Sequence, residues 1–198
     1  MNTLIIATKN KGKAEEFKQM LSPLGFQVKT LLDFSDTMPD IEETGTTFYE
    51  NAQLKAEQIA AQLGKPVIAD DSGLEVDYLN GEPGVYSARY AGEHTNDEAN
   101  NNKLLNALKD VPEKNRTARF ICVLAFARPN ETTIFKKGTC EGKITLDPKG
   151  QNGFGYDPLF IPIGYEQTMA QLNQAEKNQL SHRYHALKAF RAWLVEQK

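Results

Sequence analysis

The sequence predicts an α/β or α+β fold built on a mixed β-sheet. In the first half of the chain, short apolar runs alternate with segments whose apolar residues recur at helical spacing, which is typical of strands joined by helices. In the second half, the apolar run 118–126 is followed by a turn at 128–131 and by a returning strand that continues to 144. This pattern predicts a long antiparallel hairpin, which we expect in the middle of the sheet. A helix closes the chain.

The chain begins with a strand at 3–7, a polar loop and a helix over 14–21 that ends at Ser22-Pro23, and a second strand follows at 26–30. The polar loop carries Lys9, Lys11 and Lys13. Free N–H groups and the positive end of a helix dipole favour anions, so this loop is a candidate phosphate site. The alternative is a solvated basic loop.

A capping box, Thr47-Phe-Tyr-Glu50, predicts the start of the next helix, which stops at Gly64. Asn51 and Lys55 share a second face of this helix at i,i+4 spacing. Glu42 and Glu43 precede the helix. Carboxylates there either complement the helix dipole or contribute to a metal site.

Two adjacent carboxylates, Asp70 and Asp71, follow the apolar run 66–69, and Ser72-Gly73 come directly after them. We expect a strand that ends in a turn at 70–73, and a further strand over 74–79. In an extended chain, neighbouring side chains point to opposite faces, so at most one of the two carboxylates faces a given site. The stretch suits either a metal with a water-activating base or a plain acidic turn.

The later segments contain the remaining candidate elements. We expect a turn at 80–84, a loop or short strand over 85–92, a helix capped by Thr95 and ended by Val111-Pro112, a strand over 159–161, a helix around 174–178 and a last helix capped by Ser181.

A glycine-rich loop, 148–158, interleaves two aromatic residues with glycines. Such a loop allows a ring to stack on a flat ligand, although core aromatics in a plain loop are the commoner case. His182 and Arg183 begin the last helix, where cations oppose the dipole. A local anion or acceptor would explain them, and so would a surface position.

The composition is that of a globular protein of 198 residues, which we interpret as a single domain spanning 1–198. The net charge of −3 argues against a nucleic-acid partner. Cys122 lies in an apolar run and should pack as a small hydrophobe, and neither it nor Cys140 has metal-ligand spacing. The sequence shows neither a signal peptide nor a transmembrane run, so we expect a cytoplasmic protein without a membrane partner.

Taken together, lysines and N–H donors suit a polyphosphate, carboxylates suit a divalent metal that bridges phosphate oxygens, and a ring between glycines suits a purine. This set indicates a metal-assisted hydrolase of nucleoside triphosphates.

The chain resembles the inosine/xanthosine triphosphate pyrophosphatase family from Leu4 to the last helix. The matching motifs are Ala7-Thr-x-Asn-x-Gly-Lys13, Glu42-Glu-Thr-Gly-x-Thr-Phe48, Asn51-Ala-x-x-Lys-Ala56, Ala69-Asp-Asp-Ser-Gly-Leu74, Pro83-Gly-Val-Tyr-Ser-Ala-Arg-Tyr90, Gly153-Phe-Gly-Tyr-Asp-Pro158 and Ser181-His-Arg183. One such motif would be weak, but all of them in order are very specific.

The resemblance implies Mg²⁺-dependent cleavage of ITP, dITP and XTP between the α- and β-phosphates, yielding the nucleoside monophosphate and pyrophosphate. It also implies an elongated mixed sheet with flanking helices that form two lobes around a cleft, and a homodimer. Guanine shares the 6-oxo group of hypoxanthine and xanthine, and the sequence does not show how GTP is rejected.

The resemblance also implies roles for individual residues. Asp71 is the expected general base and, with Glu42, a metal ligand. Lys55 and Asp70 would support the charge balance. The expected substrate-binding residues are Thr8, Lys9, Asn10, Lys11, Gly12, Lys13 and Ser72 for the triphosphate, and Phe154, Gly155, Tyr156, Asp157, Lys177, His182 and Arg183 for the base.

The sequence departs from the family pattern at two positions. Lys9 stands where many members have glycine, which puts its contact with substrate in doubt, and Tyr184 stands where a small residue is common.

Two alternatives remain open. One is a related nucleotide pyrophosphatase that prefers pyrimidine or modified bases. The other is a non-hydrolytic nucleotide-binding or RNA-associated module, which the carboxylates and the net charge disfavour.

Overall fold

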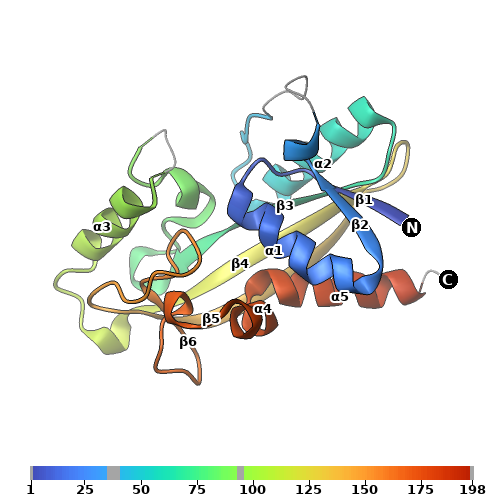
Figure 1. Cartoon of the computed structure of the whole chain (residues 1–198). Coiled ribbons are helices and arrows are strands. Elements are labelled where there is room, and N and C mark those ends of the chain that lie inside the picture. The colour runs from blue at the N-terminus through green and yellow to red at the C-terminus, as the bar shows by residue number, and fades with distance from the viewer. Residues whose placement is uncertain (1, 35–40, 93–95, 197–198) are drawn as a thin grey trace. The chain divides into compact units, whose positions relative to one another are not determined.

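The computed structural model describes residues 2–34, 41–92 and 96–196. Its strands form a six-stranded sheet in the order β2-β1-β3-β4-β5-β6 (Figure 1). The sheet is mixed, because β1 pairs in parallel with β2 and β3, whereas β5 and β6 are antiparallel. The predicted α/β fold is thus confirmed. The strands are β1 (Asn2–Ile6), β2 (Phe26–Thr30), β3 (Val67–Val76), β4 (Thr117–Ala127), β5 (Ile134–Ile144) and β6 (Phe160–Pro162).

The α-helices are α1 (Lys11–Leu21), α2 (Phe48–Leu63), α3 (Asp97–Ala107), α4 (Gln174–Leu180) and α5 (His182–Glu196). No helix among the described residues is long and apolar enough to cross a membrane.

The chain divides into two compact units. The first unit comprises Met1–Asp71, Cys122–Lys137 and Ala186–Lys198, and the second comprises Ser72–Ile121 and Gly138–His185. The strands β3, β4 and β5 each pass from one unit into the other, and the division of β3 falls between Asp71 and Ser72.

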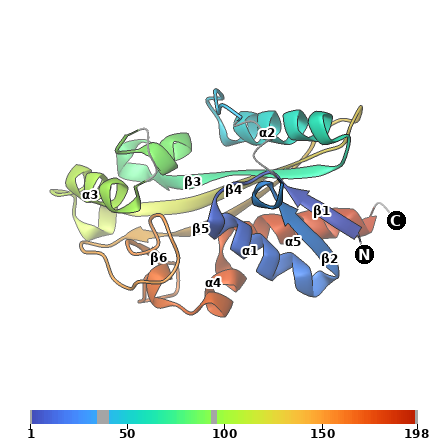
Figure 2. The same cartoon turned by 45° about the horizontal axis from the view of Figure 1, so that its top comes forward.

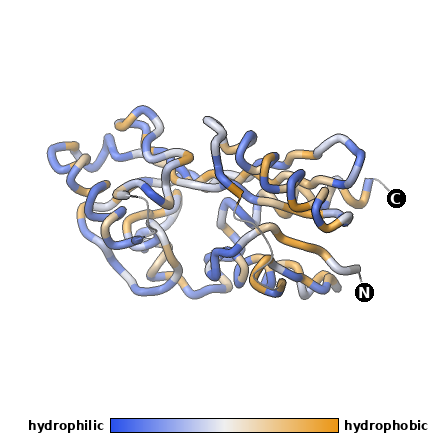
Figure 3. The backbone as a smooth tube through the Cα atoms, turned by 90° about the horizontal axis from the view of Figure 1, so that it is seen from above, coloured by the Kyte–Doolittle hydropathy of each residue, from blue (hydrophilic) through white to orange (hydrophobic). Residues whose placement is uncertain are grey.

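In the first unit, α2 lies on one face of the strands, and α1 and α5 lie on the other face (Figure 2). Side chains of α1 and α5, including Phe17 and Phe190, form a buried core with alternate residues of the strands, such as Leu4, Ile6 and Ile68. This period of two is what strands covered on both faces require. The hydropathy colouring accordingly shows β1 as an apolar stretch beside the N-terminus (Figure 3).

The second unit has its own core, in which residues of β3, α3, β4 and β5 pack with the loop after β5 and with β6. Its fully buried members include Leu74, Leu104, Ile144 and Phe160, and Tyr156 joins them from the glycine-rich loop.

Local sequence signals fixed several element boundaries. Thr47 caps α2 in a complete capping box with Glu50, and Gly64 ends that helix in the left-handed conformation at φ 60°. Ser181 accepts a hydrogen bond from the Tyr184 N–H at the start of α5, as its predicted capping role requires. Asn10, not singled out as a cap, caps α1 through a bond from the Lys13 N–H.

The turn predicted at 70–73 is wrong. Strand β3 runs without interruption from Val67 to Val76, through both carboxylates, Ser72 and Gly73. Asp, Ser and Gly are common in turns, which is why the sequence predicted one. However, the Asp70 carboxylate is buried against Lys13 and the Asp71 carboxylate against the Asn51 amide, and these tertiary contacts keep the chain extended.

Smaller expectations were also corrected. The strand predicted over 74–79 is present as far as Val76, where β3 ends, and residues 77–79 form a 3-10 turn. Residues 84–89, within the stretch predicted as a loop or short strand, form a 3-10 helix. The predicted cap Thr95 lies outside the described residues, and the side chain of Asn96 caps α3. Strands β4 and β5 are neighbours joined by the short connection 128–133, as the predicted hairpin requires.

Candidate active site

Asp71 is a buried carboxylate in β3, and each of its oxygens faces a different donor. Its Oδ2 accepts a hydrogen bond of 3.2 Å from Asn51 Nδ2, and its Oδ1 lies 3.4 Å from Lys55 Nζ. Burial raises the pKa of Asp71 above its ordinary value, although Lys55 and Lys13 oppose this rise. A buried carboxylate with a raised pKa accepts a proton more readily than an exposed one.

Lys55 contacts two carboxylates, those of Glu43 and Asp71, and one backbone carbonyl, that of Asp70. Its ammonium donates to Glu43 Oε1 at 2.8 Å and to the Asp70 carbonyl at 2.7 Å, besides its contact with Asp71. Burial acts to lower the pKa of Lys55, but the charges of Asp71, Glu43 and Asp70 outweigh it, so the pKa lies above the ordinary value. Lys55 is therefore a permanent cation beside Asp71.

Asp70 points to the opposite face of the strand. Its side chain is 1% exposed and forms an ion pair of 3.0 Å with Lys13 in the first turn of α1. The alternation expected of adjacent strand residues is thus present, with Asp71 directed to α2 and Asp70 to α1.

The loop before α1 is held by its own side chains. Thr8 is buried and its hydroxyl accepts a hydrogen bond from the Asn10 N–H at 3.2 Å. Asn10 caps the helix, and Lys9 and Lys11 are exposed. Gly12 lies within α1 and leaves backbone, rather than a side chain, at the start of the helix. The loop therefore remains a candidate anion site at the start of a helix, and its Lys13 is paired with Asp70.

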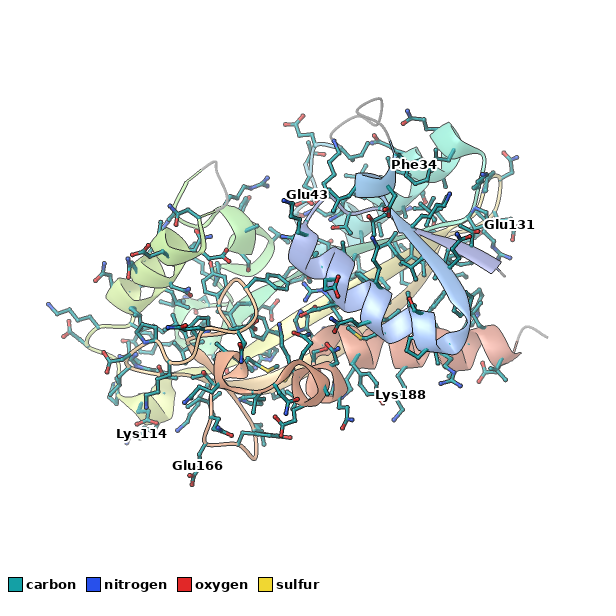
Figure 4. The ribbon with its side chains drawn as sticks, in the orientation of Figure 1. Phe34, Glu43, Lys114, Glu131, Glu166 and Lys188 are labelled. Atoms are coloured by element: carbon teal, nitrogen blue, oxygen red, sulfur yellow. The ribbon has the colours of Figure 1, made fainter. Side chains whose placement is uncertain are left out.

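The segment 42–45, here called the acidic segment, precedes α2 and contacts two residues of that helix that bind Asp71. Gly45 N–H donates to Asn51 Oδ1 at 2.8 Å, and Glu43 binds Lys55. Glu43 is labelled in Figure 4, on the segment that leads into α2. Glu42 is exposed. We name Glu43, Asn51, Lys55, Asp70 and Asp71 the Asp71 cluster; all five belong to the first unit.

The glycine-rich loop is built around Asp157 in the second unit. The Asp157 carboxylate accepts hydrogen bonds from the Phe154 N–H at 2.9 Å and from Lys177 Nζ at 2.7 Å. A Cβ atom on Gly153, whose φ is +77°, would lie 2.0 Å from Asp157 Oδ2. Only glycine therefore fits at position 153.

Two cationic side chains lie near the ring of Phe154. Lys177 Nζ lies 4.9 Å and Arg183 Cζ 5.3 Å from the ring centroid. Arg183 also donates to Ser72 Oγ at 2.8 Å, which gives this residue of the first helical turn the local acceptor that the sequence suggested. We name Ser72, Phe154, Asp157, Lys177 and Arg183 the Phe154 cluster; all five belong to the second unit.

His182 and Tyr156 are both packed rather than exposed. The His182 ring stacks on Phe120 at 4.9 Å between centroids and 17° between planes. Tyr156 lies in the core, where its hydroxyl donates to the Ser87 carbonyl at 2.8 Å and burial raises its pKa. The alternative of a core aromatic describes Tyr156, whereas Phe154 is half-buried.

Three residues that the sequence interpretation did not assign hold this region in place. Asp97 accepts a hydrogen bond of 2.7 Å from the Gly155 N–H, and Asn101 donates to the Gly155 carbonyl at 3.0 Å, so α3 holds both sides of one glycine. Ser87 links Tyr156 to β3, because its hydroxyl accepts from the Leu74 N–H at 2.9 Å. The only sequence signal was that Ser87 lies within the Pro83–Tyr90 motif.

The carboxylates offer an incomplete set of metal ligands. Across residues 2–34, 41–92 and 96–196, no group of three or more His, Cys, Asp or Glu side chains could hold a metal ion.

Comparison with known proteins places the chain among relatives of the same length. The sequence model of the Ham1 family matches residues 4–193. The chain belongs to the Ham1 family. It is 57% identical over 194 residues to a dITP/XTP pyrophosphatase of Oceanobacillus iheyensis, covering 98% of each chain, and 53% identical over 188 residues to one of Bacillus subtilis, covering 95% of this chain and 94% of that one.

Solved structures of the family share the fold. The structure of the Ham1 protein from Staphylococcus aureus is similar at a TM-score of 0.87 and 47% identity, covering 100% of each chain. A HAM1 protein from Coxiella burnetii is similar at a TM-score of 0.87 and 41% identity, covering 99% of this chain and 100% of that one.

Proposed function

We propose that this chain is a nucleoside-triphosphate pyrophosphatase that hydrolyses the non-standard purine nucleotides dITP, ITP and XTP to the monophosphate and pyrophosphate. The observation that carries the proposal is the shared name of its relatives, dITP/XTP pyrophosphatase, at 53 to 58% identity over nearly the whole chain. The buried carboxylate of Asp71, with Lys55 and Asn51 around it, supports a hydrolytic site.

In the proposed reaction, Asp71 accepts a proton from water as the water oxygen attacks the α-phosphorus. The bond between the α-phosphorus and the oxygen that bridges to the β-phosphorus breaks, and pyrophosphate leaves. The raised pKa of Asp71 supports its role as the base. Lys55 stays protonated and offsets negative charge that gathers around Asp71.

Mg²⁺ is the proposed cofactor, and Asp71 and Glu42 are the residues that would hold it. When bound, it would neutralise charge on the phosphate oxygens. Thr8, Asn10 and the lysines of the first loop would bind the triphosphate through the start of α1, with Lys13 exchanging Asp70 for phosphate. Lys9 is exposed and departs from the family pattern, in which many members have glycine at this position.

The base would bind at the Phe154 cluster. Phe154 offers a half-buried ring for stacking, and Lys177, His182 and Arg183 offer donors for the 6-oxo group of hypoxanthine and xanthine. Adenine presents an amino donor at the same position, so it would face donor against donor.

We further infer a cytoplasmic homodimer of 22.1 kDa chains, each a single domain, with neither nucleic acid nor membrane as a partner. Sedimentation of the purified protein tests the dimer. A monomer at micromolar concentration would contradict it.

A substrate panel tests the function. With Mg²⁺, the purified protein should release pyrophosphate from ITP, dITP and XTP far faster than from ATP or GTP. Orthophosphate as the first product, or equal rates on all of these nucleotides, would contradict the proposal. Faster turnover of pyrimidine or modified nucleotides would favour the related pyrophosphatase instead.

A further inference from the structure

We propose that Asn51 is a positioning residue of this enzyme, which fixes the orientation of the Asp71 carboxylate and ties it to the acidic segment before α2. The inference rests on the proposed function and adds to it a residue that acts through Asp71.

Asn51 is fully buried in α2, and its side-chain amide makes two contacts outside that helix. Its Nδ2 donates to Asp71 Oδ2 at 3.2 Å, and its Oδ1 accepts from the Gly45 N–H at 2.8 Å. Asparagine is a poor helix former, and a buried amide is costly unless it is hydrogen-bonded. A buried position on this helix would suit an alanine such as its neighbour Ala52. The two contacts give a reason for the amide.

The Gly45 contact decides which way the amide of Asn51 points. A backbone N–H can only donate, so the amide atom that faces Gly45 must be the oxygen. The nitrogen then faces Asp71, and Oδ2 of Asp71 must act as an acceptor. The orientation of the amide therefore follows from hydrogen-bonding chemistry and not from the placement of the atoms alone.

The two carboxylate oxygens of Asp71 have different hydrogen-bond partners. Oδ2 is held by Asn51, whereas Oδ1 has the longer contact of 3.4 Å with Lys55. Lys55 makes shorter bonds to Glu43 and to the Asp70 carbonyl, at 2.8 and 2.7 Å. We therefore assign Oδ1 as the oxygen that faces the reacting water and Oδ2 as the oxygen that anchors the carboxylate.

Asn51 and Lys55 stand one helical turn apart and bridge the same two segments. Asn51 joins Gly45 to Asp71, and Lys55 joins Glu43 to Asp70 and Asp71. A Cβ atom on Gly45 would lie 2.7 Å from Asn51 Oδ1, so the segment approaches the amide as closely as glycine allows. These contacts therefore hold the acidic segment in a fixed position relative to β3, the strand that contains Asp71.

The test is Asn51→Asp, which keeps an oxygen for the Gly45 N–H but replaces the donor facing Asp71 with an acceptor. Because a misplaced catalytic group costs about 100-fold, we expect kcat on ITP to fall by roughly 10- to 100-fold while KM stays within about threefold. A purely structural role would lower stability without this split between kcat and KM.

The matched control is Asn100→Asp in α3. Asn100 is also buried, and its amide accepts from the Ala91 N–H and donates to the Ala88 carbonyl. This substitution likewise keeps an acceptor and removes a donor, with no link to Asp71. We expect a comparable fall in melting temperature and a kcat within about twofold of the wild type.

The outcomes separate the two proposals. Three outcomes would overturn the role of Asn51. In the first, Asn51→Asp folds and keeps the wild-type kcat; in the second, it changes only KM. In the third, Asn100→Asp lowers kcat as much as Asn51→Asp does. If Asn51→Asp does not fold, Asn51→Ala decides, because alanine suits this buried helix position and removes the donor to Asp71 without adding a charge; a lowered kcat supports the role and an unchanged one overturns it. Wild-type protein inactive on ITP, dITP and XTP would instead overturn the proposed function.

Discussion

At the scale of single residues, Asp71 and its neighbour Asp70 show how position divides two like side chains. Both are buried in the same strand, but Asp71 meets Asn51 and Lys55 from α2, and Asp70 meets Lys13 from α1. Asp71 is the proposed base, whereas Asp70 forms an ion pair with Lys13, the lysine proposed to bind phosphate.

Asp71→Asn should remove most turnover and leave the fold intact. The amide occupies the same space but cannot accept a proton from water, so we expect a loss of about 100- to 10,000-fold in kcat. Pyrophosphate release and thermal melting measure the two effects. Asp77→Asn is the control, since Asp77 lies just beyond β3 and pairs with Arg119 on the surface. Near-normal activity of Asp71→Asn would remove it from the role of base.

His182→Phe should erode the preference for 6-oxo purines. Phenylalanine keeps the stack on Phe120 but lacks ring N–H groups, so a change would report hydrogen bonding and not lost packing. We expect the ratio of kcat/KM for ITP over ATP to fall by about tenfold, as for the loss of one hydrogen bond. The control is His185→Phe. His185 lies one turn of α5 after His182, and its ring is hydrogen-bonded to the Thr139 carbonyl. An unchanged ratio in His182→Phe rules this role out.

At the scale of elements, α3 holds the glycine-rich loop by clamping Gly155 from both sides. The loop in turn carries Phe154, which is proposed to stack on the base. Its conformation therefore depends on a helix that is distant in sequence.

Asp97→Ala should raise KM for ITP by about tenfold with little change in kcat, because a hydrogen bond to a charged group contributes about 1.5–3 kcal/mol. Steady-state kinetics measure the two constants separately. Glu98→Ala is a matched control: both residues lie in the first turn of α3 and interact with its dipole, but Glu98 is exposed. Equal effects of the two substitutions would contradict the clamp.

Elements with strong local signals could be predicted from the sequence, and those decided by distant partners could not. Thr47, Glu50 and Gly64 fixed the ends of α2, because capping depends on neighbouring residues. The stretch 70–73 was predicted as a turn, because nothing in it shows that Lys13 and Asn51 will stabilise its carboxylates in an extended strand.

The same distinction applies to the candidate site. The charged members of the two clusters were proposed from the motifs and the family resemblance. Asp97 and Asn101 were not, since each acts on the backbone of Gly155, more than fifty positions away. Tyr156 was predicted beside the base, and the structure places its ring in the core. An aromatic residue between glycines is compatible with either position, and only tertiary packing decides.

At the scale of the whole molecule, three strands run through both compact units. Loss of one unit would remove part of each of these strands. We therefore expect the chain to unfold as one cooperative domain.

The two cysteines can test this cooperativity, because Cys122 lies in the first unit and Cys140 in the second. Both are buried, and burial raises the pKa of Cys140 to about 12, so native thiols should react slowly at neutral pH. In the single-cysteine variants Cys140→Ala and Cys122→Ala, the remaining thiol should become reactive at the same urea concentration. Well-separated midpoints would show that the units are independent domains.

The uninterrupted strand β3 also constrains how this chain can change in length. Because successive residues of a strand alternate between faces, inserting one residue between Val67 and Asp70 would turn Asp70 towards α2 and Asp71 towards α1. Every residue would be retained, yet the proposed base would exchange faces with the carboxylate that pairs with Lys13. Insertions and deletions in this strand should therefore be tolerated, if at all, only in even numbers.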